Sequence, residues 1–286
     1  MIPLDTSPIV GPAPRRADSH KGDYGHILLV GGSLGMSGAI TLSALAALRS
    51  GAGLVTVAVP ESVLPTVAAA EPSYMTWPLP CNAHGQLTAA AAQALAPLWE
   101  KADVLAVGPG LGRSEAAVQL VRHLYAEWPK PMVVDADGLY ALAGWPAATL
   151  KPRLLTPHPG EFLRLCPDAP RERSLQEEAA VTWACEHRVV LILKGAPSLV
   201  TDGRRAAYNP TGNPGMATGG SGDVLTGIAA AVLAWQTDLY QAARLAAYVH
   251  GLAGDLAARR LGQVALIASD LVRYLPAAWK KLARTT

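Results

Sequence analysis

Six short runs of apolar residues, rich in valine, leucine and isoleucine, alternate along the chain with longer alanine-rich stretches. Each run is continuously apolar rather than alternating apolar with polar, which is typical of a strand covered by helices on both faces. The runs are HILLVGG (26–32), LVTVAVP (54–60), DVLAVGPG (103–110), PMVVDADG (131–138), RLLTPHPG (153–160) and VVLILKG (189–195). The alternation predicts right-handed βαβ units and an α/β fold with a central, mostly parallel sheet.

The alanine-rich stretches are predicted to be helices on both faces of this sheet. They are residues 38–50, 89–100, 114–128, 174–187, 223–235, 239–261 and 269–282. A tight Asp-Gly turn within residues 198–210 predicts a hairpin appended to the sheet. We expect residues 1–20, which are rich in proline, to form an arm and residues 21–286 to form a single domain with one large core.

The composition excludes several classes of protein. The net charge is only +2 and the basic residues are scattered, so we predict neither nucleic acid nor a membrane as a partner. The three cysteines, Cys81, Cys166 and Cys185, lie far apart and predict neither a disulfide framework nor a zinc site. Residues 1–16 lack a signal-peptide pattern, and no apolar run approaches the ~20 residues of a membrane span. We therefore expect a cytoplasmic protein.

The segment NPGMATGGSGDVLTG, residues 213–227, surrounds an acid with glycine where a helix is predicted to begin. Glycine adopts positive φ at little cost, so the amides of Gly220, Ser221 and Gly222 can turn toward one point. The helix adds unpaired N–H groups and the positive end of its dipole, which predicts an anion hole for phosphate beside Asp223. The alternative is that Asp223 only caps the helix. Four of the eight residues 215–222 are glycine, which is more than a cap needs.

The chain contains neither the P-loop motif nor the Rossmann glycine spacing. Instead, the block NPTGNPGMATGGSGDVL (209–225) closely resembles the signature of the ADP/ATP-dependent NAD(P)H-hydrate dehydratases, members of the ribokinase-like superfamily. Six further blocks resemble this family in the family order: KGDYGHILLVGGSLGMSGA (21–39), ALRSGAGLVTVAVP (47–60), VGPGLG (107–112), DADGLYAL (135–142), LTPHPGEFLRL (155–165) and LKGAPSLVTDG (193–203). The resemblance covers most of the chain and implies a ribokinase-like fold.

The resemblance implies that Asp223 is the catalytic base, which accepts the proton of a substrate hydroxyl while the glycine turn holds the transferring phosphoryl group. In this family the hydroxyl lies on the nicotinamide ring of the S-epimer of hydrated NADH or NADPH. ADP or ATP, with Mg²⁺, phosphorylates it, and loss of phosphate restores NAD(P)H. The implied enzyme is a carbon-oxygen lyase of metabolite repair.

By matching position, Ala39, Gly110, His158 and Asp223 resemble the family's contacts with the hydrate. Ala39 and Gly110 are small enough to let a ligand approach the backbone, although each is also an ordinary helix or turn residue. His158 taken alone would be a rigid loop residue between two prolines. Glu161 resembles the acid that orients magnesium through water; the alternative is a charge that stabilises a helix N-terminus.

The adenine-nucleotide residues implied by the resemblance are Lys194, Gly195, Ala196, Pro197, Ser198 and Gly222. Lys194 can meet a phosphate as a point charge, the alternative being an exposed lysine at a strand end. Asn209 and Asn213 are expected to shape the glycine-rich loop. Asp135 and Asp137 end a predicted strand, where they could face magnesium or phosphate. Asp137 is equally consistent with a cap of a helix in GLYALAGW, and we assign neither residue a catalytic role.

The family also implies partners. It tends to form tetramers, so we expect a homo-oligomer. Relatives often carry a fused N-terminal epimerase domain, and the first predicted strand at residues 26–32 leaves no room for one here, so we expect the epimerase to be a separate protein. By analogy we favour ADP over ATP as the phosphoryl donor.

Two other functions compete with the dehydratase. A small-molecule kinase of the superfamily, such as a hydroxyethylthiazole kinase, would share Gly222 and Asp223 but lack the combined TPHPGE, KGAPS and NPxGNxGMATGG blocks. A catalytically idle nucleotide-binding sensor would have no need of a base at position 223.

Overall fold

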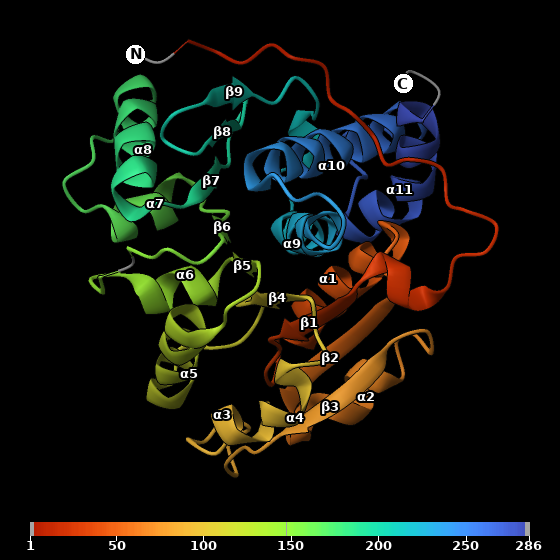
Figure 1. Cartoon of the computed structure of the whole chain (residues 1–286), viewed down its shortest axis with the longest axis vertical. Helices are drawn as coiled ribbons and strands as arrows, with labels where there is room; N and C mark the ends of the chain where they lie inside the picture. The colour runs from red at the N-terminus through yellow and green to blue at the C-terminus, as the bar shows by residue number, and fades with distance from the viewer. Residues whose placement is uncertain (1–2, 147, 284–286) are drawn as a thin grey trace.

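The computed structural model describes residues 3–146 and 148–283. Within these residues nine strands form one sheet in the order β3-β2-β1-β4-β5-β6-β7-β8-β9 (Figure 1). The strands are β1 (His26–Val30), β2 (Leu54–Pro60), β3 (Met75–Leu79), β4 (Val104–Val107), β5 (Met132–Val134), β6 (Arg153–Leu155), β7 (Val190–Leu193), β8 (Leu199–Thr201) and β9 (Ala206–Tyr208). All pairs from β3 to β7 are parallel, while β8 is antiparallel to both neighbours. The mostly parallel sheet and the appended hairpin are both confirmed.

The strand order reverses at β1. β1 pairs with β2 on one side and with β4 on the other, so Leu28 lies between Thr56 and Leu105. Ligands of open α/β sheets bind beyond the carboxyl ends of the strands at such a reversal. The segments that follow β1 and β4 therefore mark the place to look for a site.

Helices cover both faces of the sheet (Figure 1). One layer and its core contain α1 (Ser37–Arg49), α2 (Leu64–Ala68), α9 (Ser221–Leu233), α10 (Leu239–Leu261) and α11 (Ala268–Leu282). The other contains α3 (Ala91–Ala94), α4 (Ala96–Trp99), α5 (Glu115–Glu127), α6 (Asp137–Leu142), α7 (Pro159–Leu165) and α8 (Arg173–His187). The 3₁₀ turns are η1 (Lys21–Tyr24), η2 (Glu61–Val63) and η3 (Pro214–Met216). Alternate residues of each strand enter opposite cores, which is why the runs are continuously apolar.

Several elements differ from the sequence-based expectation, and the short helix α2 was not predicted. The helix predicted at 89–100 is two short helices, because Pro97 has no N–H to continue the first. The edge strand β3 was not predicted: it is half-exposed and contains Pro78, so it has no continuous apolar run. α9 begins at Ser221 rather than at Asp223, so Asp223 is its third residue and not its cap.

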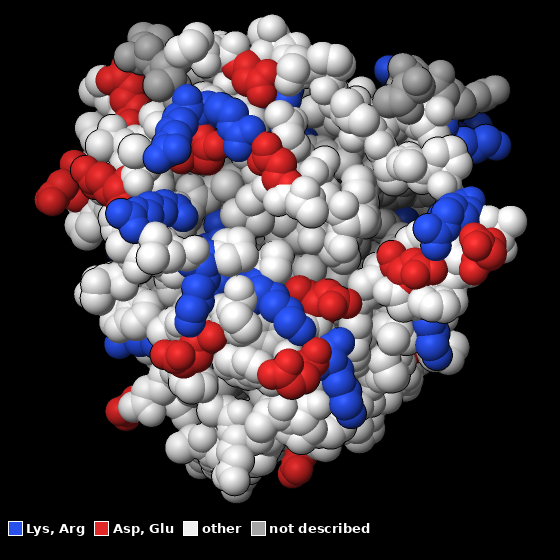
Figure 2. Space-filling view, viewed as in Figure 1, with Lys and Arg blue, Asp and Glu red and all other residues white. Residues whose placement is uncertain are grey.

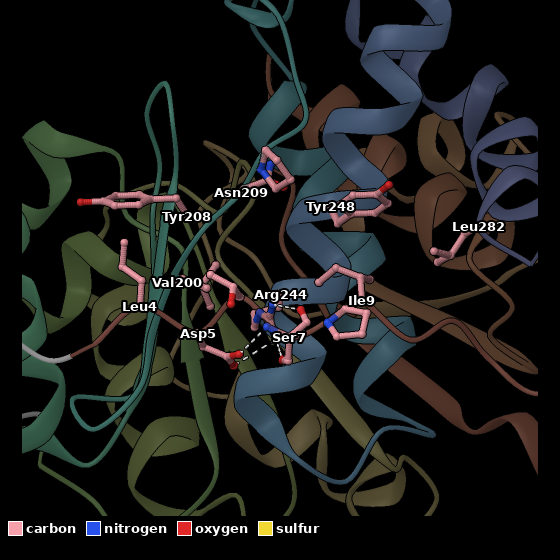
Figure 3. Close-up of a pocket in the computed structure, with 14 residues that line it drawn as sticks. Leu4, Asp5, Ser7, Ile9, Val200, Tyr208, Asn209, Arg244, Tyr248 and Leu282 are labelled. Carbon is pink, nitrogen blue, oxygen red and sulfur yellow. Dashed lines mark hydrogen bonds and ion pairs between the residues drawn. The ribbon is translucent and has the colours of Figure 1, made fainter. Parts of the chain in front are cut away.

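The N-terminal segment crosses the β8–β9 hairpin and α10. Leu4 forms a parallel bridge with Ala206 of β9. Arg244 of α10, whose side chain is only 6% exposed, pairs with the Asp5 carboxylate at 3.0 Å and donates to the Ser7 hydroxyl at 2.7 Å (Figure 3). The segment is therefore attached to the sheet edge by the Leu4 bridge and to α10 by an ion pair with the buried Arg244.

The surface gives two further observations. On the face seen in Figure 2, basic and acidic side chains are interspersed and no broad basic area forms. Within residues 3–146 and 148–283, no helix has both the length and the apolar character needed to cross a membrane.

Candidate functional site

The glycine-rich segment forms a tight turn at the start of α9. Gly220, the residue before the helix, has φ +92°, a backbone conformation that favours glycine. A Cβ there would lie 2.7 Å from Leu42 Cδ1 and 2.9 Å from Ala268 Cβ, so no side chain fits. The first amides of α9 are thus left as bare backbone at the positive end of a 13-residue helix. This is the arrangement expected of an anion hole.

Asp223 lies in the first turn of α9 and is half-buried. Burial, together with the negative charge of Asp135, raises its pKa to about 7, and Lys194 opposes the rise only in part. Asp137 and Glu161 add smaller effects in the same direction as Asp135. A carboxylate with a pKa near the working pH is suited to accept a proton from a substrate.

Lys194, directly after β7, is the cation of this cluster. Its Nζ lies 2.9 Å from Asp135 Oδ1 and 3.6 Å from Glu161 Oε2, and its side chain is 22% exposed. Burial lowers the pKa of Lys194, but the two carboxylates outweigh burial and leave it raised, so the amine stays charged. The alternative of a solvent-exposed strand-end lysine is therefore wrong. Asp135 also accepts from the Thr226 hydroxyl at 2.8 Å, which ties β5 to α9.

Gly222 lies over this ion pair. A Cβ on Gly222 would lie 3.3 Å from Lys194 Nζ and 3.6 Å from Asp135 Oδ2. The structure thus brings Lys194 of one sequence block to Gly222 and Asp223 of another.

His158 and Glu161 form a capping box at the start of α7. His158 Nδ1 accepts from the amides of Gly160 and Glu161, at 3.0 and 3.2 Å, and Glu161 Oε2 accepts from the His158 amide at 2.8 Å. The helix-terminus alternative for Glu161 thus holds, and the same carboxylate also faces Lys194. His158 Nε2 faces the second Glu161 oxygen at 3.5 Å, and its side chain is 52% exposed.

The segment from Lys194 to Ser198 is held by Arg173, the first residue of α8. The Arg173 guanidinium donates to the carbonyls of Lys194, Leu193 and Pro197 at 3.0–3.4 Å. Ser198 closes the turn, because its hydroxyl donates to the Gly195 carbonyl at 3.1 Å and accepts from the Gly195 amide. The segment thus has one defined conformation beside the Lys194 cluster.

Ala39 and Gly110 meet at the reversal of the strand order. Gly110 has φ +63°, and a Cβ there would lie 2.5 Å from the Met36 carbonyl and 3.1 Å from Ala39 Cβ. Behind them, Ser43 of α1 donates to the Asp223 carbonyl at 2.8 Å. A Cβ at Gly227 of α9 would lie 2.0 Å from the Ser43 carbonyl oxygen, so α1 and α9 pack backbone against backbone.

Sequence reasoning left three acidic or basic groups without a role. Asp135 is 1% exposed and is the counter-ion of Lys194. Asp137 does not cap α6 with its side chain; it accepts from the Gly112 amide and pairs with Arg113, both within 2.9 Å. His250 of α10 contacts the Ser221 carbonyl. The DAD motif pointed to the two aspartates, but a single histidine in an alanine-rich helix gives no such signal.

The described residues contain no group of three or more His, Cys, Asp or Glu side chains arranged to hold a metal ion. Carboxylate oxygens are nevertheless present around Lys194, and Mg²⁺ commonly binds through one or two carboxylates, water and substrate phosphates. The residues fit a magnesium ion that arrives with a nucleotide rather than one held by the protein alone.

A cavity of about 540 Å³ lies between the N-terminal segment, the hairpin and α10, and Asp5, Arg244 and Tyr248 line it (Figure 3). Asn209 of the glycine-rich loop lines it, but none of the predicted catalytic, substrate-binding or nucleotide-binding residues does. It is separate from the cluster around Asp223.

Comparison with known proteins agrees with this geometry. A sequence model of the family described as NAD(P)H-hydrate dehydratase matches residues 27–277. The bifunctional NAD(P)H-hydrate repair enzyme Nnr of Moorella thermoacetica is 48% identical over 92% of this chain, which spans 51% of that relative. The ADP-dependent (S)-NAD(P)H-hydrate dehydratase of Cenarchaeum symbiosum is 38% identical over 94% of this chain and 93% of its own.

A solved structure is also similar over almost the full length. The ADP/ATP-dependent NAD(P)H-hydrate dehydratase from Bacillus subtilis, co-crystallised with ATP and Mg²⁺, superimposes with a TM-score of 0.81 at 32% identity, covering 95% of each chain.

Proposed function

The chain belongs to the NAD(P)H-hydrate dehydratase family, and we propose that it uses ADP or ATP to dehydrate the S-epimer of hydrated NADH or NADPH back to NAD(P)H. The observation that carries the proposal is the half-buried Asp223 beside the glycine turn, with a pKa of about 7. The chain spans about half the length of the bifunctional relatives and nearly all of the Cenarchaeum dehydratase.

The reaction starts with the proton of the ring hydroxyl. In the proposed mechanism the Asp223 carboxylate takes this proton while the hydroxyl oxygen attacks the terminal phosphorus of the nucleotide. The bond between that phosphorus and its bridging oxygen breaks, and a nucleotide shorter by one phosphate leaves. The amides of Gly220, Ser221 and Gly222 donate hydrogen bonds that stabilise the negative charge on the phosphoryl oxygens. The charged amine of Lys194, which lies beside Gly222, adds a positive charge to the site.

The second stage expels the phosphate. The ring nitrogen supplies the electron pair that breaks the carbon–oxygen bond, and loss of a proton from the neighbouring ring carbon restores the dihydronicotinamide. Phosphate leaves far more readily than hydroxide, which is why phosphorylation must come first. The proposed contacts for the hydrate are Ala39 of α1, Gly110 in the segment after β4, and His158 in the segment after β6.

Magnesium is proposed as the partner of the nucleotide phosphates. When bound it would neutralise part of their charge, with Glu161 orienting it through water. The adenine nucleotide is proposed to lie along Lys194, Gly195, Ala196, Pro197 and Ser198, on the side of Gly222 away from the hydrate.

The direct test is recovery of NADH absorbance when the purified protein is incubated with hydrated NADH, Mg²⁺ and either ADP or ATP. Recovery with at least one nucleotide is expected, and comparison of the two assigns the donor. No recovery with either, together with phosphorylation of a thiazole alcohol, would instead indicate the related kinase activity.

The Asp223→Asn variant tests the proposed base. Removing a general base typically lowers the rate by about 10²–10⁴-fold, while binding of the nucleotide, followed by calorimetry, should stay largely intact. Near-normal turnover would contradict the assignment. The kinase and idle-sensor alternatives are weaker, because the family match covers residues 27–277 and the base position is occupied.

The remaining expectations concern partners and location. The names of the bifunctional relatives support our proposal of a functional link to an epimerase. The homotetramer and the cytoplasmic location stay predictions from the sequence.

A further inference from the structure

The helix α10 supports most of the glycine-rich loop that precedes Asp223. The Asn209 side-chain amide donates to the Ala247 carbonyl at 3.1 Å, and the Thr211 hydroxyl donates to the Tyr248 carbonyl at 2.8 Å. Both acceptors lie on α10. The expectation that Asn209 shapes this loop therefore has a structural basis, and the surface that receives it belongs to one helix.

The next two turns of α10 continue this contact. A Cβ at Gly251 would lie 2.3 Å from Thr211 Oγ1, and one at Gly254 would lie 2.3 Å from Met216 Sδ, so both positions are bare backbone under the loop. The Asp255 carboxylate accepts two hydrogen bonds at 3.0 Å, one from the Asn213 side-chain amide and one from the Gly212 backbone amide. The loop is thus seated on α10 from residue 209 to residue 216.

His250 extends the support to the anion hole itself. It lies on the same helix, and its Nε2 is 2.9 Å from the Ser221 carbonyl oxygen. Burial, together with the charge of Lys194, lowers the pKa of His250 to about 4, and the hydrogen bond to the Ser221 carbonyl and the charge of Asp135 oppose this only in part. The ring is therefore neutral at physiological pH. Because the partner is a carbonyl, the proton must be on Nε2, and His250 donates.

Ser221 is the residue through which this bond can act on the site. It is the first residue of α9, between Gly220 and Gly222 and two residues before Asp223. Its hydroxyl is buried and has no hydrogen-bond partner among the described residues. The first turn of α9 is thus attached to α10 through the Ser221 carbonyl rather than through the Ser221 side chain.

We infer that His250 is a positioning residue: by donating from Nε2 to the Ser221 carbonyl, it fixes the first turn of α9 so that the glycine amides and the Asp223 carboxylate keep one geometry during phosphoryl transfer. This inference rests on the proposed function. A displacement of about 1 Å in such a constellation can cost about 10²-fold in rate. The loss should appear in kcat, because the nucleotide segment at Lys194 to Ser198 is held independently by Arg173.

The test compares His250→Gln with His250→Asn. The glutamine amide can place an N–H donor where Nε2 is, whereas the asparagine amide is one carbon too short to reach Ser221. We expect kcat within about threefold of wild type for the glutamine variant and about 10–100-fold lower for the asparagine variant. The KM for nucleotide should change little in either, and the two should unfold at similar temperatures. His84→Asn, at an exposed position, is the control.

A second measurement does not depend on turnover. Hydrogen exchange of the amides in residues 218–225 should be faster in His250→Asn than in wild type and restored in His250→Gln. Wild-type kcat in the asparagine variant, equal losses in both variants, or unchanged exchange would overturn the inference. If the wild-type protein fails to dehydrate hydrated NADH, the proposed function fails, while the exchange comparison still decides the role of His250.

Discussion

Replacing Asp223 with asparagine should stabilise the fold in neutral and alkaline solution even as it removes the proposed base. The carboxylate sits half-buried among other acids, and its pKa in the folded protein is raised from 3.8 to about 7. The folded protein therefore binds the Asp223 proton more tightly than the unfolded chain does. Ionising Asp223 costs folding free energy, which an uncharged amide of similar shape does not.

The size of this effect follows from the pKa. A rise from 3.8 to about 7 corresponds to about 4 kcal/mol of folding free energy at full ionisation. Because the side chain keeps contact with water and Lys194 lies nearby, we expect about 2 kcal/mol to be observed.

The pH dependence has a defined sign. Below pH 3.8 the carboxyl group is neutral in both the folded and the unfolded chain, so the two proteins should be equally stable. Between pH 3.8 and about 7 the wild type should lose stability relative to the variant, and the gap should level off above pH 7.

The assay is urea-induced unfolding of both proteins at a series of pH values. Asp18→Asn is a matched control, since the Asp18 side chain is 84% exposed and its substitution should give a gap near zero at every pH. A gap between wild type and Asp223→Asn that stays constant from pH 4 to pH 8 would refute the view that burial and Asp135 hold the carboxyl group in its protonated form.

Two further predictions follow from the same contacts. The pH–rate profile of the wild type should fall about tenfold per unit below a midpoint near 7, because only ionised Asp223 accepts a proton, and Asp135→Asn should move that midpoint to lower pH; a midpoint that does not move would contradict the coupling. Gly227→Ala should destabilise the fold by about 3 kcal/mol in thermal unfolding, because its Cβ would lie 2.0 Å from the Ser43 carbonyl oxygen, whereas Gly38→Ala, with open space around it, should be neutral or stabilising by about 0.5 kcal/mol.

Much of the fold could be predicted from the sequence, because burial on both faces gives a strand a continuous apolar run. The six predicted runs contain β1, β2, β4, β5, β6 and β7. β3 escaped prediction because an edge strand needs no such run: Met75 is 45% exposed and Pro78 interrupts the pattern. The break at Pro97 was missed because the high alanine content of residues 89–100 favoured one continuous helix.

The candidate site could be predicted only where the residue types needed for the chemistry are also needed for the backbone conformation. Gly220 is visible in the sequence because its positive φ and its crowded surroundings both favour glycine, and Gly222 stands out beside it in the same glycine-rich segment. The pairing of Lys194 with Asp135 and Glu161 was not, since it joins three segments through tertiary packing. His250 was missed for the same reason: its role depends on how α10 crosses the start of α9.

The contact between Gly227 and Ser43 also bears on how the enzyme can move. At Gly227 the backbones of α1 and α9 are in direct contact, and the Ser43 hydroxyl donates to the Asp223 carbonyl, so movement of one helix is coupled to movement of the other. α1 carries Ala39 and α9 carries Asp223, so the proposed hydrate wall and the proposed base form one rigid unit. A change in the distance between the two proposed binding regions would therefore involve the segment from Lys194 to Ser198, which is held by Arg173 and by the turn that Ser198 closes.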